Sequence, residues 1–284
     1  MIIETKNLTK YYGKIRGIEN LSFSIEKGEI FGFLGPNGAG KTTTIRTLLG
    51  FLKPTRGEAF LFEKNVEKEI VKIKEKTGYI PGELALYGDL TAKDLLKYFG
   101  SLRSNFDEEK LERLLKIFEL PLNRKVKGYS RGMKQKLSIV QAFMHNPELI
   151  IMDEPTAGLD PLLQEKFYDF LREEKKEGKT MFISSHILTE VEKISDRVGI
   201  IKDGHLIALE SIDTLKNKKG KVVRVKTAET IEISRIETRM EDGWTSFVIT
   251  KDVDEVIKKL AKYTIQDIEI GELSLEEIFM HYYR

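Results

Sequence analysis

The chain has no cysteine among its 284 residues. Disulfide frameworks and thiolate metal sites are therefore excluded, and a reducing compartment is compatible with the composition. Long apolar runs are absent too, since none approaches the roughly 18 residues of a membrane-spanning helix. The segment Met1 to Lys6 lacks the apolar core of a secretion signal. We therefore expect the chain to be soluble by itself.

A large excess of charge of one sign is also absent. The 47 basic and 45 acidic residues are mixed along the chain and leave a net charge of +2. No net field attracts nucleic acid, so we expect no nucleic-acid partner. With 40% hydrophobic residues, a chain of this length is able to bury one large core, alone or together with a second small one. Two domains are compatible with these values.

One glycine-rich segment fits a phosphate-binding pattern. Residues 35–42, GPNGAGKT, match G-x-x-x-x-G-K-[ST] and lie between an apolar run at 29–34 and a helix-like segment at 42–52. The glycines let successive amides point at phosphate oxygens at a helix N-terminus, Lys41 reaches the β- and γ-phosphates, and Thr42 offers its hydroxyl to Mg²⁺. A chance glycine-rich turn would lack these flanks. The sequence therefore predicts binding of a nucleoside triphosphate.

The other apolar runs predict an α/β fold. Runs at 149–152, 180–183 and 198–201 are typical of buried strands, and an amphipathic helix at about 162–176 separates the first two. Such alternation indicates a mainly parallel sheet covered on both faces. Helical periodicity dominates from about residue 90 to 144, where Thr91 is placed to cap a helix. This predicts an inserted helical region.

Shorter strands are expected beside the phosphate loop. The segments 2–4 and 21–25 predict two strands joined by a turn at Gly13, and 57–62 predicts another.

Two carboxylates follow the apolar run at 149–152. Asp153 and Glu154 thus lie at a strand end, where a doubly wound sheet places its ligand. Asp153 is expected to hold Mg²⁺ through water, and Glu154 to orient or deprotonate the attacking water. A solvated pair that ends a strand is the alternative, which the nearby phosphate loop disfavours.

A histidine follows the strand predicted at 180–183. His186 is placed to donate to the γ-phosphate and to hold the attacking water in position. A lone histidine is more often structural, but this one follows a strand whose predecessor supplies Asp153 and Glu154. The other histidines, His145, His205 and His281, are expected to have no partners and no chemical role.

The order of these motifs closely resembles that of the ATP-binding cassette (ABC) ATPases over about residues 2–215. Two more segments carry the resemblance, SRGMKQ at 130–135 and GLD at 158–160. By this resemblance the first is the signature motif, which contacts the ATP of a partner protomer through Ser130, Arg131, Gly132, Met133 and Lys134. Ser130 precedes a helix as an N-cap, so its hydroxyl and the next amides form an anion site. Alone, this segment would indicate only a helix start.

The resemblance also implies the remaining site residues. Asp160 belongs to the D-loop, which communicates between protomers, and Tyr12 occupies the position of the aromatic residue that stacks on adenine. Tyr11 adjoins Tyr12, and ordinary packing remains an alternative for both. The implied nucleotide-binding residues are Tyr12, Gly35, Pro36, Asn37, Gly38, Ala39, Gly40, Lys41, Thr42 and Thr43.

The Q-loop departs from the family pattern. That loop usually carries a glutamine after a proline, whereas this chain has Pro81-Gly82-Glu83. Gly82 therefore removes the usual side-chain ligand to Mg²⁺ and water, and three replacements stay open: Glu83, a water, or backbone flexibility. Leu86 and Tyr87 are expected either in the groove that receives a helix of the membrane subunit or in the core.

The segment 216–284 predicts a small α+β domain. Strands are expected at 222–226, 230–238 and 244–250, with a hairpin turn at 242–243. A helix opens at about 252 with Val253, Val256, Ile257 and Leu260 on one face. A second helix behind Ser274 is expected to carry an apolar face of Leu275, Ile278, Phe279 and Tyr282. This ending is similar to the C-terminal extension of ABC exporter ATPases.

The whole chain is thus expected to be a P-loop NTPase cassette at 1–215, with a mainly parallel sheet, antiparallel strands and a helical subdomain at about 85–147, followed by the small domain. The resemblance implies the ATP-hydrolysing subunit of an ABC exporter that uses ATP and Mg²⁺. One cassette per chain implies a homodimer or a heterodimer with another ABC ATPase. A separate integral membrane permease is the implied partner, with the ATPase peripheral on the cytoplasmic face of the cell membrane.

Other functions fit less well. A DNA-repair ABC ATPase would carry a long heptad insertion, and a translation-associated one would carry two cassettes, yet neither is present. A P-loop GTPase would need Asn-Lys-x-Asp, whereas Asn217-Lys218 precedes Lys219-Gly220. A purely regulatory module would have lost catalytic residues, which this chain retains.

Overall fold

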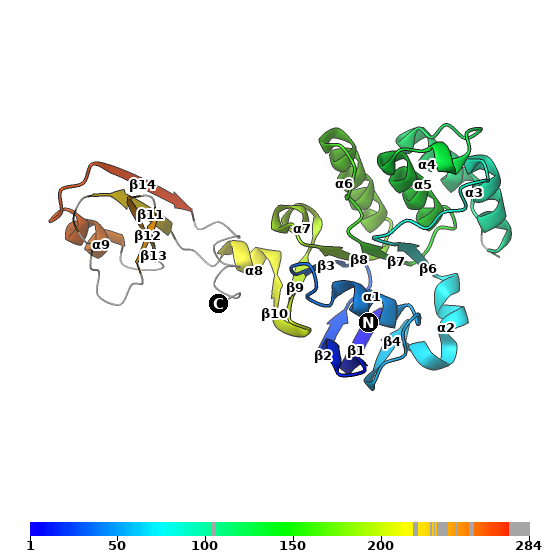
Figure 1. Ribbon diagram of the computed structural model, residues 1–284, viewed down its shortest axis with the longest axis horizontal. Coiled ribbons are helices and arrows are strands. Elements are labelled where there is room, and N and C mark those ends of the chain that lie inside the picture. The colour runs from blue at the N-terminus through cyan, green and yellow to red at the C-terminus, as the bar shows by residue number, and fades with distance from the viewer. Residues whose placement is uncertain are drawn as a thin grey trace. The chain divides into compact units, whose positions relative to one another are not determined.

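The computed structural model describes residues 1–103, 106–217, 221–227, 229, 231, 238–241, 243–249 and 253–272. The chain divides into two compact units, Met1–Ser211 and Ile212–Arg284 (Figure 1). Within the described residues, no helix is long and apolar enough to cross a membrane.

The first unit alternates strands and helices. Its elements in chain order are β1 (Ile3–Tyr12), β2 (Ile15–Ile25), β3 (Ile30–Leu34), α1 (Lys41–Leu48), β4 (Arg56–Leu61), β5 (Lys64–Asn65), α2 (Val66–Glu75), β6 (Thr77–Ile80), α3 (Ala92–Ser101), α4 (Glu108–Phe118), the 3₁₀ turn η1 (Val126–Gly128), α5 (Arg131–Phe143), β7 (Leu149–Asp153), α6 (Pro161–Lys176), β8 (Thr180–Ser185), α7 (Leu188–Ile194), β9 (Arg197–Lys202) and β10 (His205–Ser211).

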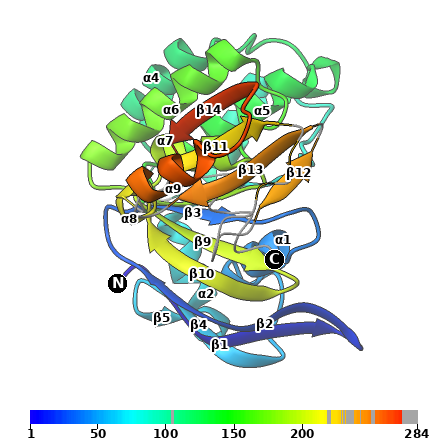
Figure 2. The same ribbon diagram turned by 90° about the vertical axis from the view of Figure 1, so that its left-hand side faces the viewer.

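Two sheets organise this unit. The larger has the strand order β10-β9-β3-β8-β7-β6, with parallel pairing throughout except for β10, which is antiparallel to β9. The smaller is antiparallel, with the order β2-β1-β4-β5, and lies below the larger one in Figure 2. The predicted α/β fold with a mainly parallel sheet is confirmed.

Apolar layers cover both faces of the larger sheet. Ile150 and Met152 of β7 belong to the core beneath α3 to α6, whereas Leu149 and Ile151 belong to the core shared with α1 and the small sheet. Because side chains alternate along a strand, a strand buried on both faces is apolar at successive positions. This burial explains why β3, β7 and β8 were recognisable as short apolar runs.

The helical region lies between β6 and β7. Its helices begin at side-chain caps, since Thr91 accepts a hydrogen bond from the Asp94 amide and Ser130 accepts one from the Met133 amide. Leu114 and Phe118 of α4 are fully buried, and Leu111 and Leu115 pack beside them. The expected inserted helices are therefore present.

Three boundaries differ from those expected. Strands β1 and β2 are much longer than the segments 2–4 and 21–25, and their pairing shifts register at three points of β1. Such bulges break the alternation by which a strand is recognised. Helix α1 ends at Leu48 rather than near residue 52, and Gly50 follows with a left-handed φ of 67°.

The second unit contains α8 (Ile212–Asn217), β11 (Lys221–Lys226), β12 (Arg239–Glu241), β13 (Trp244–Ile249), α9 (Val253–Leu260) and β14 (Asp267–Glu272). Its antiparallel sheet has the order β12-β13-β11-β14. Val256 and Leu260 of α9 pack on one face of this sheet, whereas Ile257 is 45% exposed and does not share the expected buried face. Most of the strand expected at 230–238, and the whole apolar face expected at 275–282, lie outside the described residues.

Candidate functional site

The carboxyl ends of three parallel strands bring the expected site residues together. β3 leads into the phosphate loop, β7 ends at Asp153, and β8 ends one residue before His186. In register, Asp153 of β7 lies beside Ser184 of β8, and Leu34 of β3 lies beside Ser185. Loops that follow neighbouring parallel strands meet at one edge of the sheet.

The phosphate loop ends at an uncapped helix N-terminus. Helix α1 begins at Lys41, and its N-cap residue Gly40 has φ of 109° and no side-chain hydrogen bond. A Cβ atom on Gly40 would lie 2.7 Å from the Gly17 carbonyl oxygen, and one on Gly35 would lie 2.4 Å from that of Ile201. Only glycine fits these two positions. Such an N-terminus carries unpaired amides and a partial positive charge, which favour an anion.

The remaining residues of the loop support this shape. Pro36 accepts a hydrogen bond from the Ala39 amide at 3.2 Å, and Ala39 in turn accepts one from the Gly204 amide at 2.9 Å. Gly38 has a left-handed φ of 82°. Asn37 is exposed at the loop tip.

Lys41 is buried in this loop, with 5% of its side chain exposed. Its ammonium donates to the Gly35 carbonyl at 2.7 Å and to the Pro36 carbonyl at 3.1 Å. The same nitrogen lies 3.4 Å from Oε1 of Glu154. The charge of Lys41 is therefore held at the loop and beside the expected catalytic carboxylate.

Asp153 accepts hydrogen bonds from two hydroxyl groups. Thr42 donates to its Oδ2 at 2.8 Å, and Ser184 donates to its Oδ1 at 2.5 Å. Asp153 is 3% exposed, and a buried carboxylate requires such partners. The Thr42 and Asp153 oxygens thus lie together beside the phosphate loop.

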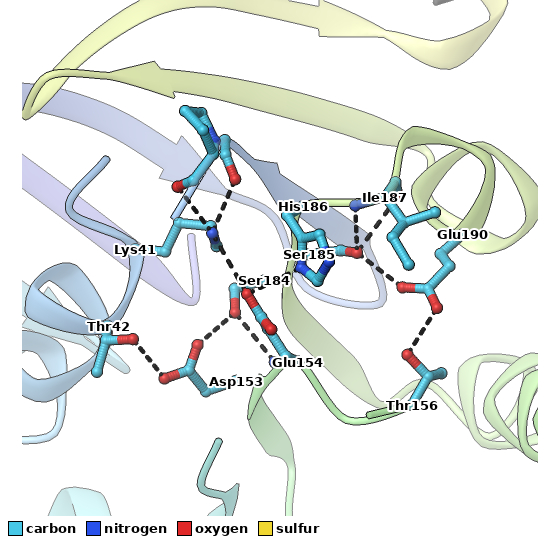
Figure 3. A network of polar contacts seen from close by, with 12 residues as sticks. Lys41, Thr42, Asp153, Glu154, Thr156, Ser184, Ser185, His186, Ile187 and Glu190 are labelled. Carbon is cyan, nitrogen blue, oxygen red and sulfur yellow. Dashed lines mark hydrogen bonds and ion pairs between the residues drawn. The ribbon is translucent and has the colours of Figure 1, made fainter. Parts of the chain in front are cut away.

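Glu154 points to a different set of partners. Its backbone is left-handed, with φ of 48°, and its amide lies 3.2 Å from both the carbonyl oxygen and Oγ of Ser184. Its Oε1 lies 3.2 Å from Nδ1 of His186, so one carboxylate oxygen contacts both His186 and Lys41. Figure 3 shows these side chains converging from the strand ends.

The structure distinguishes Tyr12 from Tyr11. The Tyr12 hydroxyl lies 3.4 Å from Oγ1 of Thr43, directly after the phosphate loop, and its ring is 44% exposed. A hydrogen bond to the Glu19 carboxylate is the main cause that raises the pKa of the Tyr11 phenol. Tyr12 thus offers an accessible ring at the edge of the phosphate loop, whereas the hydroxyl of Tyr11 is bonded to a strand residue.

Gly82 adjoins the carboxylate of Asp153. A Cβ atom at Gly82 would lie 3.4 Å from Oδ2 and from the carbonyl oxygen of Asp153, which is ordinary contact. Burial, followed by the nearby charge of Asp153, raises the pKa of the Tyr79 phenol to about 12. The Q-loop position is therefore next to the expected metal-binding carboxylate, and a side chain would fit there.

The signature segment contacts the D-loop of the same chain. A Cβ atom on Gly132 would lie 3.0 Å from the Gly158 carbonyl oxygen. Ser130 also accepts the Lys134 amide through its carbonyl, and Met133 packs against the core. Arg131 lies against Gly158. Asp160 caps α6 by accepting the Leu163 amide at 3.0 Å.

Four residues of this network were not predicted from the sequence. Thr156, Ser184, Ser185 and Glu190 connect the segments that carry Asp153, Glu154 and His186 through hydrogen bonds. The available signal was weak: two serines directly before His186, and a glutamate four residues after it.

The expectation that His145 and His205 have no partners is wrong. His145 is 1% exposed and its Nε2 lies 3.3 Å from the Thr77 carbonyl oxygen, and Nε2 of His205 lies 3.5 Å from Oε2 of Glu19. Buried polar groups are normally paired in this way. His281 lies outside the described residues.

Comparisons with known proteins agree with this site. The family model described as ABC transporter matches residues 18–157. A bacitracin transport ATP-binding protein of Bacillus licheniformis is 40% identical over 231 residues, which cover 80% of this chain and 76% of that protein.

Two solved structures extend the comparison. The structure of an ATP-binding subunit of an ABC transporter is similar with a TM-score of 0.71 and 32% identity, over 77% of this chain and 93% of that one. A dimeric cassette, MJ0796, in a post-hydrolysis state with ADP and Pi has a TM-score of 0.68 and 27% identity, over 74% of this chain and 99% of that one. The chain therefore belongs to the ABC transporter family, as an ATP-binding cassette subunit that hydrolyses ATP.

Proposed function

We propose that this ATPase drives export through a separate membrane permease, by means of a catalytic site built on Glu154. The observation that carries this proposal is the position of the Glu154 carboxylate, between Nζ of Lys41 and Nδ1 of His186 at the carboxyl ends of β7 and β8. A carboxylate in this place is suited to take a proton from water that attacks the γ-phosphate.

Each residue has a distinct role in the proposed reaction. Lys41 and the amides at the start of α1 bind the phosphates and stabilise the charge that develops on them. Glu154 accepts the proton of the attacking water, and His186 holds the γ-phosphate and the water in position. Tyr12 stacks on the adenine, with Thr43 at its hydroxyl.

Mg²⁺ is the proposed metal, and the residues present fit it. Hard cations prefer oxygen ligands, and Mg²⁺ is commonly bound by one or two protein groups together with substrate phosphates. Thr42 and Asp153 supply such oxygens in one place. Among the residues that the structure describes, no group of three or more His, Asp or Glu side chains could hold a metal alone. The metal would neutralise charge on the phosphates.

We propose a dimer in which each ATP lies between two protomers. The signature residues Ser130 to Lys134 of one chain would meet the phosphate loop of the other, and Asp160 would lie at the same interface. Helix α5 begins at Arg131 directly after the Ser130 cap, and the amides of its first turn favour a phosphate. The dimeric cassette bound to ADP and Pi supports this arrangement, which is compatible with a homodimer or a heterodimer.

A permease partner and outward transport complete the proposal. The similarity to a bacitracin transport ATP-binding protein supports a transport role and an antibiotic-like cargo. In this proposal the cassette is peripheral on the cytoplasmic face of the membrane, and ATP-dependent closure of the dimer changes the state of the permease.

The test replaces one carboxylate oxygen. Glu154→Gln should still bind ATP but turn over about 10²–10⁴-fold more slowly, which is the usual contribution of a positioned base. An ATP-loaded dimer should accumulate and elute early in size-exclusion chromatography. Glu165→Gln is the matched control, because Glu165 is 52% exposed and pairs with Lys193 away from the site. Hydrolysis by Glu154→Gln at the parental rate would rule out Glu154 as the base.

A further inference from the structure

Glu190 on α7 is bonded to two loops at once. Its Oε1 accepts a hydrogen bond from the Thr156 hydroxyl at 2.8 Å, and its Oε2 accepts one from the Ser185 hydroxyl at 2.7 Å (Figure 3). Each oxygen of one carboxylate thus holds a different segment of the chain.

The two donors lie next to the proposed catalytic residues. Thr156 is two residues after Glu154, in the loop that follows β7, and Ser185 directly precedes His186 at the end of β8. These two segments carry Glu154 and His186, whose Oε1 and Nδ1 atoms lie 3.2 Å apart. Glu190 therefore adds a side-chain connection, beyond the pairing of β7 with β8, between the two segments that carry the proposed catalytic pair.

Burial and charge make this connection stiff. Thr156 is 5% exposed and Ser185 is 2% exposed, so water competes poorly for either hydroxyl. Hydrogen bonds to an ionised carboxylate are shorter and stronger than those between neutral groups.

The start of α7 is tied to the same group of residues. Burial, followed by the carboxylates of Glu190 and Glu165, raises the pKa of the Tyr168 phenol on α6. Ser185 Oγ accepts the Ile187 amide at 2.9 Å, which ties the first residues of α7 to the same group. A displacement of either loop therefore strains the contact to the other.

We propose that Glu190 is a positioning residue that sets the geometry of Glu154 and His186 by holding the Thr156 loop to the Ser185 loop. This inference rests on the proposed roles of Glu154 and His186. Glu190 acts through its two hydrogen bonds and not by direct contact with ATP. The Gly35 amide donates to the Ser185 carbonyl at 3.2 Å, a backbone contact that loss of the Glu190 side chain leaves in place. Loss of Glu190 should therefore displace the catalytic pair more than it weakens nucleotide binding.

The experiment separates turnover from nucleotide binding. In the full-length ATPase, Glu190→Ala should lower kcat for ATP hydrolysis by about 10- to 100-fold, the loss expected when catalytic groups are misplaced by about 1 Å. KM for ATP should stay within about twofold of the parental value. Glu190→Gln keeps the shape of the side chain and one acceptor oxygen. Its kcat should therefore lie between that of the parental enzyme and that of Glu190→Ala.

Glu165→Ala is the matched control. It removes another carboxylate between α6 and α7, one that pairs with Lys193 and touches neither loop, and it should leave kcat and KM unchanged. Thermal unfolding of all variants monitors folding. A fall in kcat for Glu165→Ala as large as that for Glu190→Ala would assign the effect to helix packing and overturn the proposal.

A double-mutant cycle tests the connection itself. Thr156→Val and Ser185→Ala each remove one donor and should each lower kcat, whereas adding either change to Glu190→Ala should alter kcat by less than about twofold. Thr156→Ser and Ser185→Thr keep the hydroxyl groups, so their kcat should be close to the parental value and above that of Thr156→Val and Ser185→Ala. Fully additive effects would refute the coupling.

The outcomes also distinguish this inference from the proposed function. If Glu154→Gln is inactive while Glu190→Ala retains the parental kcat, only the role of Glu190 is wrong. If Glu154→Gln is as active as the parent, the catalytic roles on which the inference rests are wrong and the inference falls with them.

Discussion

Lys110 on α4 and Glu174 on α6 form a buried ion pair, with side chains that are 7% and 1% exposed. The Lys110 ammonium also lies 3.2 Å from Oε2 of Glu177. Removing one partner of a buried pair leaves the other charge uncompensated, which costs about 3–5 kcal/mol. Because Arg113 still favours the ionised form of Glu174, we expect Lys110→Met to lower the free energy of unfolding by about 3 kcal/mol, the lower end of this range.

The loss should depend on pH in a defined direction. Burial raises the pKa of the Glu174 carboxyl above its ordinary 4.5, and Lys110 opposes that rise. Without Lys110, the pKa of Glu174 in the folded protein rises further. Because the pKa of Glu174 is higher in the folded protein than in the unfolded chain, the folded protein binds more protons between these two pKa values. The contribution of Glu174 to stability is therefore fully present below its unfolded pKa and is lost as pH rises through its folded pKa. Lys110→Met should therefore destabilise the protein more at about pH 8 than at about pH 5.

Urea denaturation at the two pH values measures both effects. Lys116→Met is the matched control, because Lys116 is an exposed lysine on the same helix, and it should change the free energy of unfolding by less than about 0.5 kcal/mol. Lys110→Met combined with Glu174→Leu replaces the charges by apolar groups and should recover most of the loss. The reasoning is refuted if Lys110→Met behaves like Lys116→Met, or if the double variant is as unstable as the single one.

Burial lowers the pKa of His145 from 6.5 to about 4, so the unfolded chain binds more protons within this window. The free energy of unfolding should fall by up to about 3 kcal/mol as pH drops from 6.5 to 4, and in urea titrations His145→Gln should lose this part of the dependence. Lys41→Ala should abolish ATP binding measured by calorimetry, whereas Gly132→Asp should keep it and block hydrolysis, because a carboxylate would face the partner's γ-phosphate. Mixing these two inactive proteins should restore ATPase activity, since a heterodimer has one site free of both changes, and a mixture that stays inactive would contradict the two-protomer site.

The parts of the fold that were predictable are those with a strong local signal. β3, β7 and β8 are short apolar runs because both of their faces are buried. Thr91 and Ser130 mark helix starts because a hydroxyl at that position satisfies a free amide. Each of these signals lies within a few residues of sequence.

Features that depend on pairing between distant segments were not predictable. The register shifts of β1 against β2, between Thr5 and Tyr11, break the alternation of buried and exposed residues, so most of both strands escaped recognition. Ser184 gained its role only because the parallel register places it beside Asp153. Glu190 likewise depends on two loops that are adjacent in space and about 30 residues apart in sequence.

The separate orientations of Asp153 and Glu154 depend on a single backbone angle. In a continuous strand, successive side chains point to opposite faces of the sheet, and Glu154 would be directed into one of the packed layers. Its left-handed φ of 48° ends the strand instead. Asp153 therefore contacts Thr42 and Ser184, while Glu154 contacts Lys41 and His186.

This conformation is unfavourable for a residue other than glycine and costs on the order of 1–3 kcal/mol, so neighbouring contacts must hold it. The Ser184 carbonyl and hydroxyl hold the Glu154 amide, and the Ala157 amide donates to the Glu154 carbonyl at 3.1 Å to close the turn. Glycine would adopt the same angle with less strain but would supply no carboxylate. A glutamate at this strained position, held by partners on β8, therefore does not serve the stability of the turn, and its presence agrees with the proposed role of the Glu154 carboxylate.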